Sequence, residues 1–203
     1  TVPTQQGRME LALAPSDNDI LYLCMADNGS GTQIGRFVQL YRSDDGGATF
    51  TARADVANDP LAPELLSNMF VAFGCVVYTP YSQGWYDLAL AVDPVDPDVV
   101  WVGGIDLCRS DDGGATWGRA AYYRVPAGHP AYVHADLHGV FFHPDYDGVA
   151  NQTVYASSDG GLYRTDNARA ATSTVLCPDI ETGPNPSVTW ITLNNGYEVT
   201  QFY

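Results

Sequence analysis

Three polar residues that could do chemistry occupy alternating positions in one stretch of the chain: His134, Asp136 and His138. If this stretch is a β-strand, alternation places the three side chains on one side of it, roughly 6.5 to 7 Å apart in succession. Two imidazoles and a carboxylate can bind a divalent metal ion, and the same groups serve in acid–base catalysis. Because an unpaired polar group inside a protein is costly, such a cluster needs hydrogen-bonding partners or a ligand.

A simpler interpretation of the same cluster is a rim of hydrogen-bonded side chains around a central channel. Two further residues are expected beside it, Asp159 in a following turn and Tyr86 on a neighbouring inner strand. We therefore predict that any ligand site includes Tyr86, His134, Asp136, His138 and Asp159. His134, Asp136 and His138 are the candidate ligands of a divalent metal ion, and the sequence indicates no other cofactor and assigns no catalytic residue.

The elements that must position these residues are visible in an internal repeat. The octet SDDGGATF at 43–50 returns as SDDGGATW at 110–117, with only the final aromatic exchanged. An Asp carboxylate in a turn accepts backbone N–H groups, and Gly supplies positive φ angles at little steric cost. Thr and the aromatic then begin the next strand. Each octet is therefore expected to be the turn between the third and fourth strands of a four-stranded unit.

Similar apolar runs before each octet extend the repeat over most of the chain. In the third unit the octet is interrupted: it begins at Thr165, and its aromatic returns at Trp190 after an insertion. An earlier insertion, which follows the first unit, contains Pro63 to Phe70, which favours one short helix. The expected boundaries are about 5–56, 84–124 and 132–194 for the three units, about 57–83 for the first insertion, and 197–203 for the first strand of a further unit.

The octets resemble the Asp-box, or BNR, repeat of β-propellers, S-x-D-x-G-x-T-W. This repeat occurs in sialidases, in xyloglucanase-type glycosidases and in sortilin-type receptors, and the stretch 132–138 is most similar to uncharacterised secreted bacterial BNR-like proteins. In these families the boxes are structural and lie on the face opposite the functional one. The resemblance assigns this structural role to Ser43, Asp45, Gly47, Phe50, Ser110, Asp112, Gly114 and Trp117.

The fold implied by this resemblance is all-β. It is a β-propeller segment of about three four-stranded blades plus the first strand of a fourth, in an incomplete ring. Because three blades would leave open strand edges at both ends, the rest of the propeller or a partner chain is expected to complete the ring.

Charge and hydropathy exclude two classes of partner. The formal net charge is −15, and all nine basic residues are Arg. A surface this acidic is repelled by phosphate groups, so nucleic acid and anionic membrane surfaces are not expected partners. No apolar run approaches the roughly 18 residues needed to cross a bilayer, so membrane insertion is not expected.

The chain has four cysteines, none in a C-x-x-C pair. An even number without zinc-ligand spacing is typical of disulfides in a secreted, extracellular or cell-surface protein. Since Cys24 and the first insertion are expected on one face, and Cys108 and the interrupted octet on the other, we predict the pairs Cys24–Cys75 and Cys108–Cys177.

Two functions fit these observations. The first is a non-catalytic extracellular binding or scaffold propeller that recognises a glycan or a protein. The alternative is a sialidase-like or xyloglucanase-like glycoside hydrolase whose remaining catalytic residues lie outside this chain. Tyr123 to Pro126 resembles a sialidase motif, but it follows the second octet instead of preceding the first. A xyloglucanase would need two carboxylates facing each other across a cleft, for which Asp87, Asp106 and Asp159 are candidates.

Overall fold

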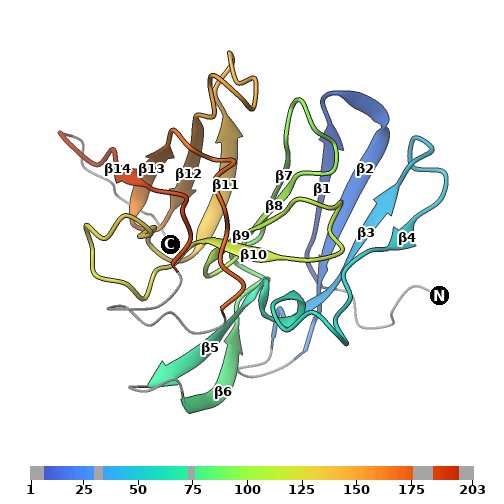
Figure 1. The fold of residues 1–203 in the computed structure, drawn as a ribbon. Helices are drawn as coiled ribbons and strands as arrows, with labels where there is room; N and C mark the ends of the chain where they lie inside the picture. Colours follow the sequence, from blue (N-terminus) through green and yellow to red (C-terminus); the bar gives the residue numbers. More distant parts are fainter. Residues whose placement is uncertain (1–6, 30–33, 73–75, 176–184, 197–203) are drawn as a thin grey trace.

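A computed structural model describes residues 7–29, 34–72, 76–175 and 185–196, and this part of the chain is nearly all β (Figure 1). It contains three antiparallel four-stranded sheets, each with its strands in chain order. The first sheet comprises β1 (Met9–Ala14), β2 (Asp17–Ala26), β3 (Phe37–Ser43) and β4 (Thr51–Ala52). The second comprises β7 (Ala89–Val92), β8 (Val100–Gly103), β9 (Leu107–Ser110) and β10 (Gly118–Ala121). The third comprises β11 (Leu137–Phe142), β12 (Val154–Ser158), β13 (Gly161–Thr165) and β14 (Ile191–Thr192).

The three sheets are successive blades of a β-propeller whose ring is not closed. Their first strands lie next to one another, β1 against β7 and β7 against β11, and Figure 1 shows the sheets side by side in chain order. One apolar core fills the space between the first and second sheets and includes Tyr22, Leu40 and Trp117. A second core lies between the second and third sheets and includes Trp101 and Trp190. The predicted all-β propeller segment is confirmed.

Burial of each strand follows from how many of its faces are covered. β8 and β9 belong to the middle sheet, and all of their residues are buried. In β1 the exposed residues alternate with partly buried ones, because a neighbouring sheet covers only one of its faces.

The first octet forms the turn between β3 and β4, as predicted. The Asp45 carboxylate accepts the backbone N–H of Thr49 at 2.8 Å and its hydroxyl at 2.7 Å. Ser43 Oγ donates to Asp45 Oδ1 at 2.8 Å and accepts the backbone N–H of Gly47 at 2.8 Å. Gly47 has a φ of 90°, which glycine adopts without strain. The second octet repeats all four bonds between β9 and β10, with Ser110, Asp112, Gly114 and Thr116.

The third, interrupted octet is rebuilt from residues on both sides of its insertion. Thr165 and Asn167 occupy the positions of Ser and Asp, with Thr165 Oγ1 donating to Asn167 Oδ1 at 2.9 Å. The same amide oxygen accepts the backbone N–H of Thr189 at 2.9 Å, although 22 positions separate the two residues. Trp190 follows and is buried in the second core. The predicted return of the aromatic at Trp190 is confirmed.

The short helix expected within Pro63 to Phe70 does not form over that range. Only a 3-10 turn forms, η2 (Ala62–Glu64), with proline in its first turn. From Ser67 the backbone is extended and forms a hairpin, β5 (Ser67–Ala72) with β6 (Val76–Ser82), seen below the blades in Figure 1. Apolar residues around η2, such as Leu65, are buried in the first core, so packing against the blades overrides the local preference for a helix.

Some predictions fall on residues that the structure does not describe. Cys24 and Cys108 are buried and form no disulfide among the described residues. Their predicted partners, Cys75 and Cys177, lie outside the described residues, so both disulfide pairings remain predictions. The strand expected at 197–203 also lies outside them. Within the described part of the chain, no helix is long and apolar enough to span a membrane.

Candidate functional site

The candidate site lies at the end of the blades opposite the octets. In an antiparallel sheet whose strands follow chain order, the turn between the second and third strands shares an end with the start of the first strand. Tyr86 and Asp87 precede β7, Asp136 precedes β11, His138 is the second residue of β11, and Asp159 lies in the turn between β12 and β13. The chain's topology therefore gathers these residues from two neighbouring blades.

Three of the five predicted site residues form one hydrogen-bonded group, here called the Asp159 trio. The Tyr86 hydroxyl donates to the Asp159 carboxylate, at 3.0 Å from Oδ1 and 3.2 Å from Oδ2. His138 Nε2 lies 2.6 Å from the same Oδ1. The rings of Tyr86 and His138 meet edge to face, with centroids 5.1 Å apart. Asp159 is thus fixed by two side chains from two different blades.

The expected alignment of His134, Asp136 and His138 on one side of a strand is wrong. β11 begins only at Leu137, and Asp136 has a φ of 64°, so the alternation of an extended strand does not reach back to His134. Asp136 instead accepts a hydrogen bond from Gln83 Nε2 at 2.8 Å.

His134 makes no described hydrogen bond to the Asp159 trio. Its ring packs against Gly160 so closely that a Cβ at that glycine would overlap it, and its Nδ1 lies 3.1 Å from the backbone oxygen of Ala135. Among the described residues no group of three or more His, Cys, Asp or Glu side chains is placed to hold a metal ion. The structure therefore does not assemble the metal site considered for His134, Asp136 and His138.

A pocket of about 290 Å³ opens beside His134. Its lining comes from the loop before β11 and from the third blade. The lining residues include Gly128, His129, Tyr132, His134, Gly160 and Trp190. Trp190 is only 5% exposed, so its ring face is not available to a ligand.

Sequence reasoning missed Trp85. The residue is 51% exposed, and the centroid of its ring lies 5.6 Å from that of the Tyr86 ring, with the two ring planes tilted by 45°. The pattern around it resembles a strand entering a core, and nothing in the spacing distinguishes this tryptophan from the three buried ones. Its exposure follows from the turn at residues 83–87, where the N–H groups of Tyr86 and Asp87 both bond to the carbonyl oxygen of Gln83.

Asp87 is the most perturbed acid of the site. It is fully buried, and no described N–H or O–H group donates to either of its oxygens, so its hydrogen-bonding partner is the carboxylate of Asp136, to which it can donate only when it is protonated. Burial, followed by the negative charge of Asp136, raises the pKa of Asp87 to about 9, so the group is neutral at pH 7. Burial and then the charge of Asp159 also raise the pKa of Asp136. The sequence placed Asp87 only among candidate carboxylates.

The structure also shows the contacts of two other candidates from the sequence, Asp106 and Arg124. Asp106 is buried, forms an ion pair with Arg119 and accepts the backbone N–H of Tyr123 at 3.0 Å. In the sialidase-like tetrapeptide, the guanidinium of Arg124 stacks on the ring of Tyr123, 5.0 Å from its centroid. Neither residue reaches the Asp159 trio through a described contact.

No protein-family model matches this chain. No curated protein matches it either. Among solved structures, the GH74 enzyme of Niastella koreensis is similar at 24% identity and a TM-score of 0.47, over 78% of this chain and 21% of the enzyme. YCF48 from Cyanidioschyzon merolae is similar at 17% identity and a TM-score of 0.41, over 93% of this chain and 38% of YCF48. A YCF48 bound to a D1 peptide is similar at 14% identity and a TM-score of 0.40, over 92% of this chain and 40% of that chain. The chain thus spans less than half the length of each of these structures.

Proposed function

We propose that this chain is part of an extracellular Asp-box propeller that binds a glycan, without catalysis, at the Asp159 trio and Trp85. The observation that carries the proposal is the half-exposed indole of Trp85 next to the ring of Tyr86, whose hydroxyl together with His138 holds the Asp159 carboxylate in place. The extracellular location is part of the same proposal and rests on the four cysteines.

The chemistry of this cluster suits a sugar. An exposed aromatic ring offers a flat apolar surface with little rotamer entropy to lose, and one face of a pyranose ring is largely C–H. An ionised carboxylate has about four lone-pair sites. The Asp159 carboxylate uses part of this capacity for Tyr86 and His138 and is still partly exposed, at 23% for its side chain. It can therefore accept hydrogen bonds from sugar hydroxyls while Trp85 packs against the ring.

Two features favour binding over hydrolysis. The carboxyl group whose pKa suits a general acid is that of Asp87, and it is buried, so a substrate cannot reach it. Hydrolysis needs two carboxyl groups flanking the bond to be cleaved, and the carboxylates that share this end of the blades with Asp159 are already engaged, Asp136 with Gln83 and Glu10 with Arg8. The alternative, a glycoside hydrolase with its second carboxylate in further blades, stays open to the same experiment.

The test is calorimetric titration of the protein with a panel of soluble neutral and acidic polysaccharides. We expect at least one of them to bind, and Trp85→Ala to weaken that binding by about tenfold, which corresponds to the roughly 1.4 kcal/mol of one aromatic contact. Trp85→Phe should retain most of the affinity, because it keeps an apolar ring. Asp159→Asn should also weaken binding.

The matched control is Asp145→Asn, which alters a carboxylate with an 88% exposed side chain in the turn between β11 and β12, at the other end of the blade. It should bind like wild type. If no polysaccharide binds, or if Trp85→Ala and Asp159→Asn bind like the control, the glycan proposal is wrong. Release of reducing ends that Asp159→Asn abolishes would favour the hydrolase instead.

A further inference from the structure

The outward faces of the first and third sheets expose apolar residues. The equivalent positions in the interfaces between blades are buried. On the first sheet Leu11 and Leu13 of β1 are 51% and 52% exposed, and the octet aromatic Phe50 is 40% exposed. The octet aromatics of the second and third blades, Trp117 and Trp190, are 3% and 5% exposed because a preceding sheet covers them. The outward face of the first sheet therefore has the composition of an interface between blades.

A second repeated feature, a pair formed by an aromatic residue and an arginine, lies on the opposite face of each sheet, toward the following blade. In every blade an aromatic residue of the second strand pairs across the sheet with an arginine of the third. The pairs are Tyr22 with Arg42, Trp101 with Arg109, and Tyr155 with Arg164. In the first two blades the guanidinium lies over the aromatic ring, 5.5 and 5.6 Å from its centroid.

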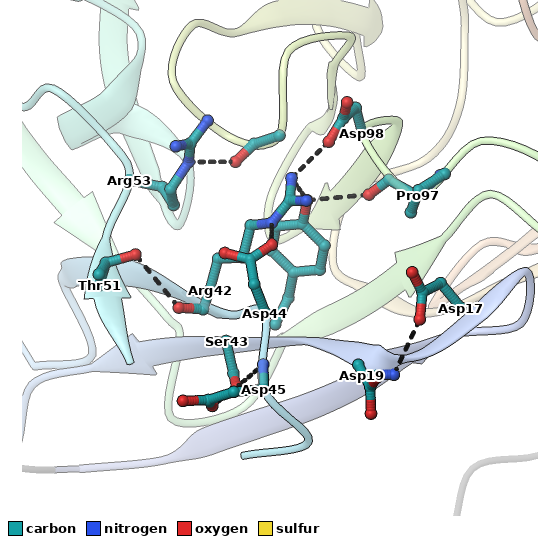
Figure 2. A network of polar contacts seen from close by, with 12 residues as sticks. Asp17, Asp19, Arg42, Ser43, Asp44, Asp45, Thr51, Arg53, Pro97 and Asp98 are labelled. Atoms are coloured by element: carbon teal, nitrogen blue, oxygen red, sulfur yellow. Dashed lines mark hydrogen bonds and ion pairs between the residues drawn. The ribbon is translucent and has the colours of Figure 1, made fainter. Parts of the chain in front are cut away.

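These arginines connect one blade to the next. Arg42 forms an ion pair with Asp98 of the second blade, and Figure 2 shows its guanidinium between Asp44 of its own octet and Asp98. Arg109 donates in the same direction, to the backbone oxygen of Ala168 in the third blade. At both interfaces between described blades, an arginine of one blade therefore donates to an acceptor on the next blade.

Arg164 lies in the third blade, at the open end of the array. It pairs with Asp166 at 2.9 Å, as Arg42 pairs with Asp44 within its own octet. The described residues form no following blade, and Arg164 Nε is buried without a hydrogen-bond partner among them. Phe141 and Ile191 on the same sheet are 56% and 50% exposed. The third sheet therefore offers a cation and an apolar surface together.

The matching acceptor is present at the other end of the molecule. Asp98 is held by a turn in which its N–H bonds to Asp96 Oδ1 at 3.1 Å, and its carbonyl accepts the N–H of Gly113 at 2.7 Å. Asp19 has the same two bonds at 3.0 Å each, from its N–H to Asp17 Oδ1 and from the N–H of Gly46 to its carbonyl. Figure 2 shows this second turn, with Asp17 and Asp19, across the octet from Arg42. Because it makes the same two bonds, Asp19 is the first blade's counterpart of Asp98. The residue is exposed.

We propose that a second copy of this chain docks head to tail on these faces, with Arg164 of one copy binding Asp19 of the other. The apolar surface around Phe141 then covers the one around Leu11, Leu13 and Phe50, as the internal blades cover each other. The contact is heterologous, so it closes into a ring where the rotation allows. Two copies of three blades give six, within the usual four to eight blades of a propeller. This inference does not depend on the proposed glycan site.

The test is the mass of the 203-residue chain in solution, by light scattering or sedimentation over a range of concentrations. We expect wild type to form an oligomer. Arg164→Glu and Asp19→Arg should each weaken self-association by at least about tenfold, because like charges then face each other. The double variant should recover the wild-type mass, since the charges are only exchanged. An equimolar mixture of the two single variants should also associate, through one exchanged and one native contact in a two-copy ring.

The exchange also controls for misfolding, because a variant that fails to fold cannot be rescued by its partner. A wild-type chain that stays monomeric at every concentration would overturn the inference and would indicate that other blades cover these faces. Single variants with the wild-type mass, or a double variant that does not recover it, would overturn it as well.

Discussion

The indole N–H of Trp190 donates to the backbone oxygen of Ala120 at 3.0 Å, joining the interrupted third octet to the last strand of the second blade. The same ring meets Trp101 edge to face, with centroids 6.5 Å apart. One side chain therefore anchors the end of a long insertion and fills the second core. In the second octet, by contrast, Trp117 donates to Gly114 of its own turn at 3.2 Å.

We expect Trp190→Ala to lower the free energy of unfolding by about 3 to 5 kcal/mol, as for truncation of a large buried aromatic. Trp190→Phe should cost less but at least the roughly 1 kcal/mol of the lost hydrogen bond. Phe50→Ala, at the equivalent but half-exposed position, is the matched control and should cost less than Trp190→Ala. Urea unfolding measures all three, and equal losses at positions 50 and 190 would contradict the third octet as described.

The two octets also allow a matched test of the first interface. Gly47 and Gly114 occupy the same turn position with φ values of 90° and 86°, so Ala costs about 1 to 2 kcal/mol of backbone strain at either. A Cβ on Gly47 would lie 3.9 Å from Leu21, an ordinary contact, whereas one on Gly114 would overlap Leu40 of the neighbouring blade. Gly114→Ala should therefore be more destabilising than Gly47→Ala by about 1 to 3 kcal/mol in thermal or urea unfolding. Equal losses would argue against this packing of blades.

The repeat predicted the blades because each octet turn is stabilised by residues that are close together in the sequence. The turn at Asp45 needs only side chains within its own octet, and the spacing of the octets then fixes where the strands begin and end. The same reasoning found Asn167 and Trp190 across an insertion, since the turn needs an acceptor and an aromatic wherever the chain supplies them.

The site could be predicted only in part. Tyr86, His138 and Asp159 meet because strand order brings the same ends of neighbouring blades together. His134 was misplaced because the positive φ of Asp136 ends the alternation. Asp tolerates positive φ better than most residues, but most aspartates do not adopt it, so the residue type alone did not predict it. The exposure of Trp85 and the burial of Asp87 depend on packing between the turn and two blades, which no short pattern encodes.

The buried thiols give a prediction about reactivity. Burial raises the pKa of both Cys24 and Cys108 to about 12. Because the thiolate is the reactive form, iodoacetamide at pH 8 should modify neither residue in the native protein. In denaturant it should modify both only after reduction, since we predict the pairs Cys24–Cys75 and Cys108–Cys177. Peptide mass spectrometry with and without prior reduction measures this. Rapid labelling of the native protein would contradict the described burial, and labelling in denaturant without reduction would contradict the predicted pairs.

Asp87 makes stability depend on pH in a direction unusual for a carboxylic acid. Its pKa rises from 3.8 to about 9 on folding, chiefly through burial, so the folded state holds the proton more tightly than the unfolded state. The stability associated with this group is complete below about pH 4. It is lost as the pH rises toward 9, at up to about 1.4 kcal/mol per pH unit.

We therefore expect Asp87→Asn to remove this loss, because the amide stays neutral at every pH. The variant should gain stability relative to wild type steadily from pH 5 to pH 8. At pH 4 it should be no more stable than wild type, since the buried amide donors then also need partners. Urea unfolding at several pH values measures the difference, with the exposed Asp145→Asn as control, which should follow the wild-type curve. If the curves of Asp87→Asn and wild type run parallel over this range, Asp87 is ionised in the folded protein, and a counter-charge or a ligand must lie beside it.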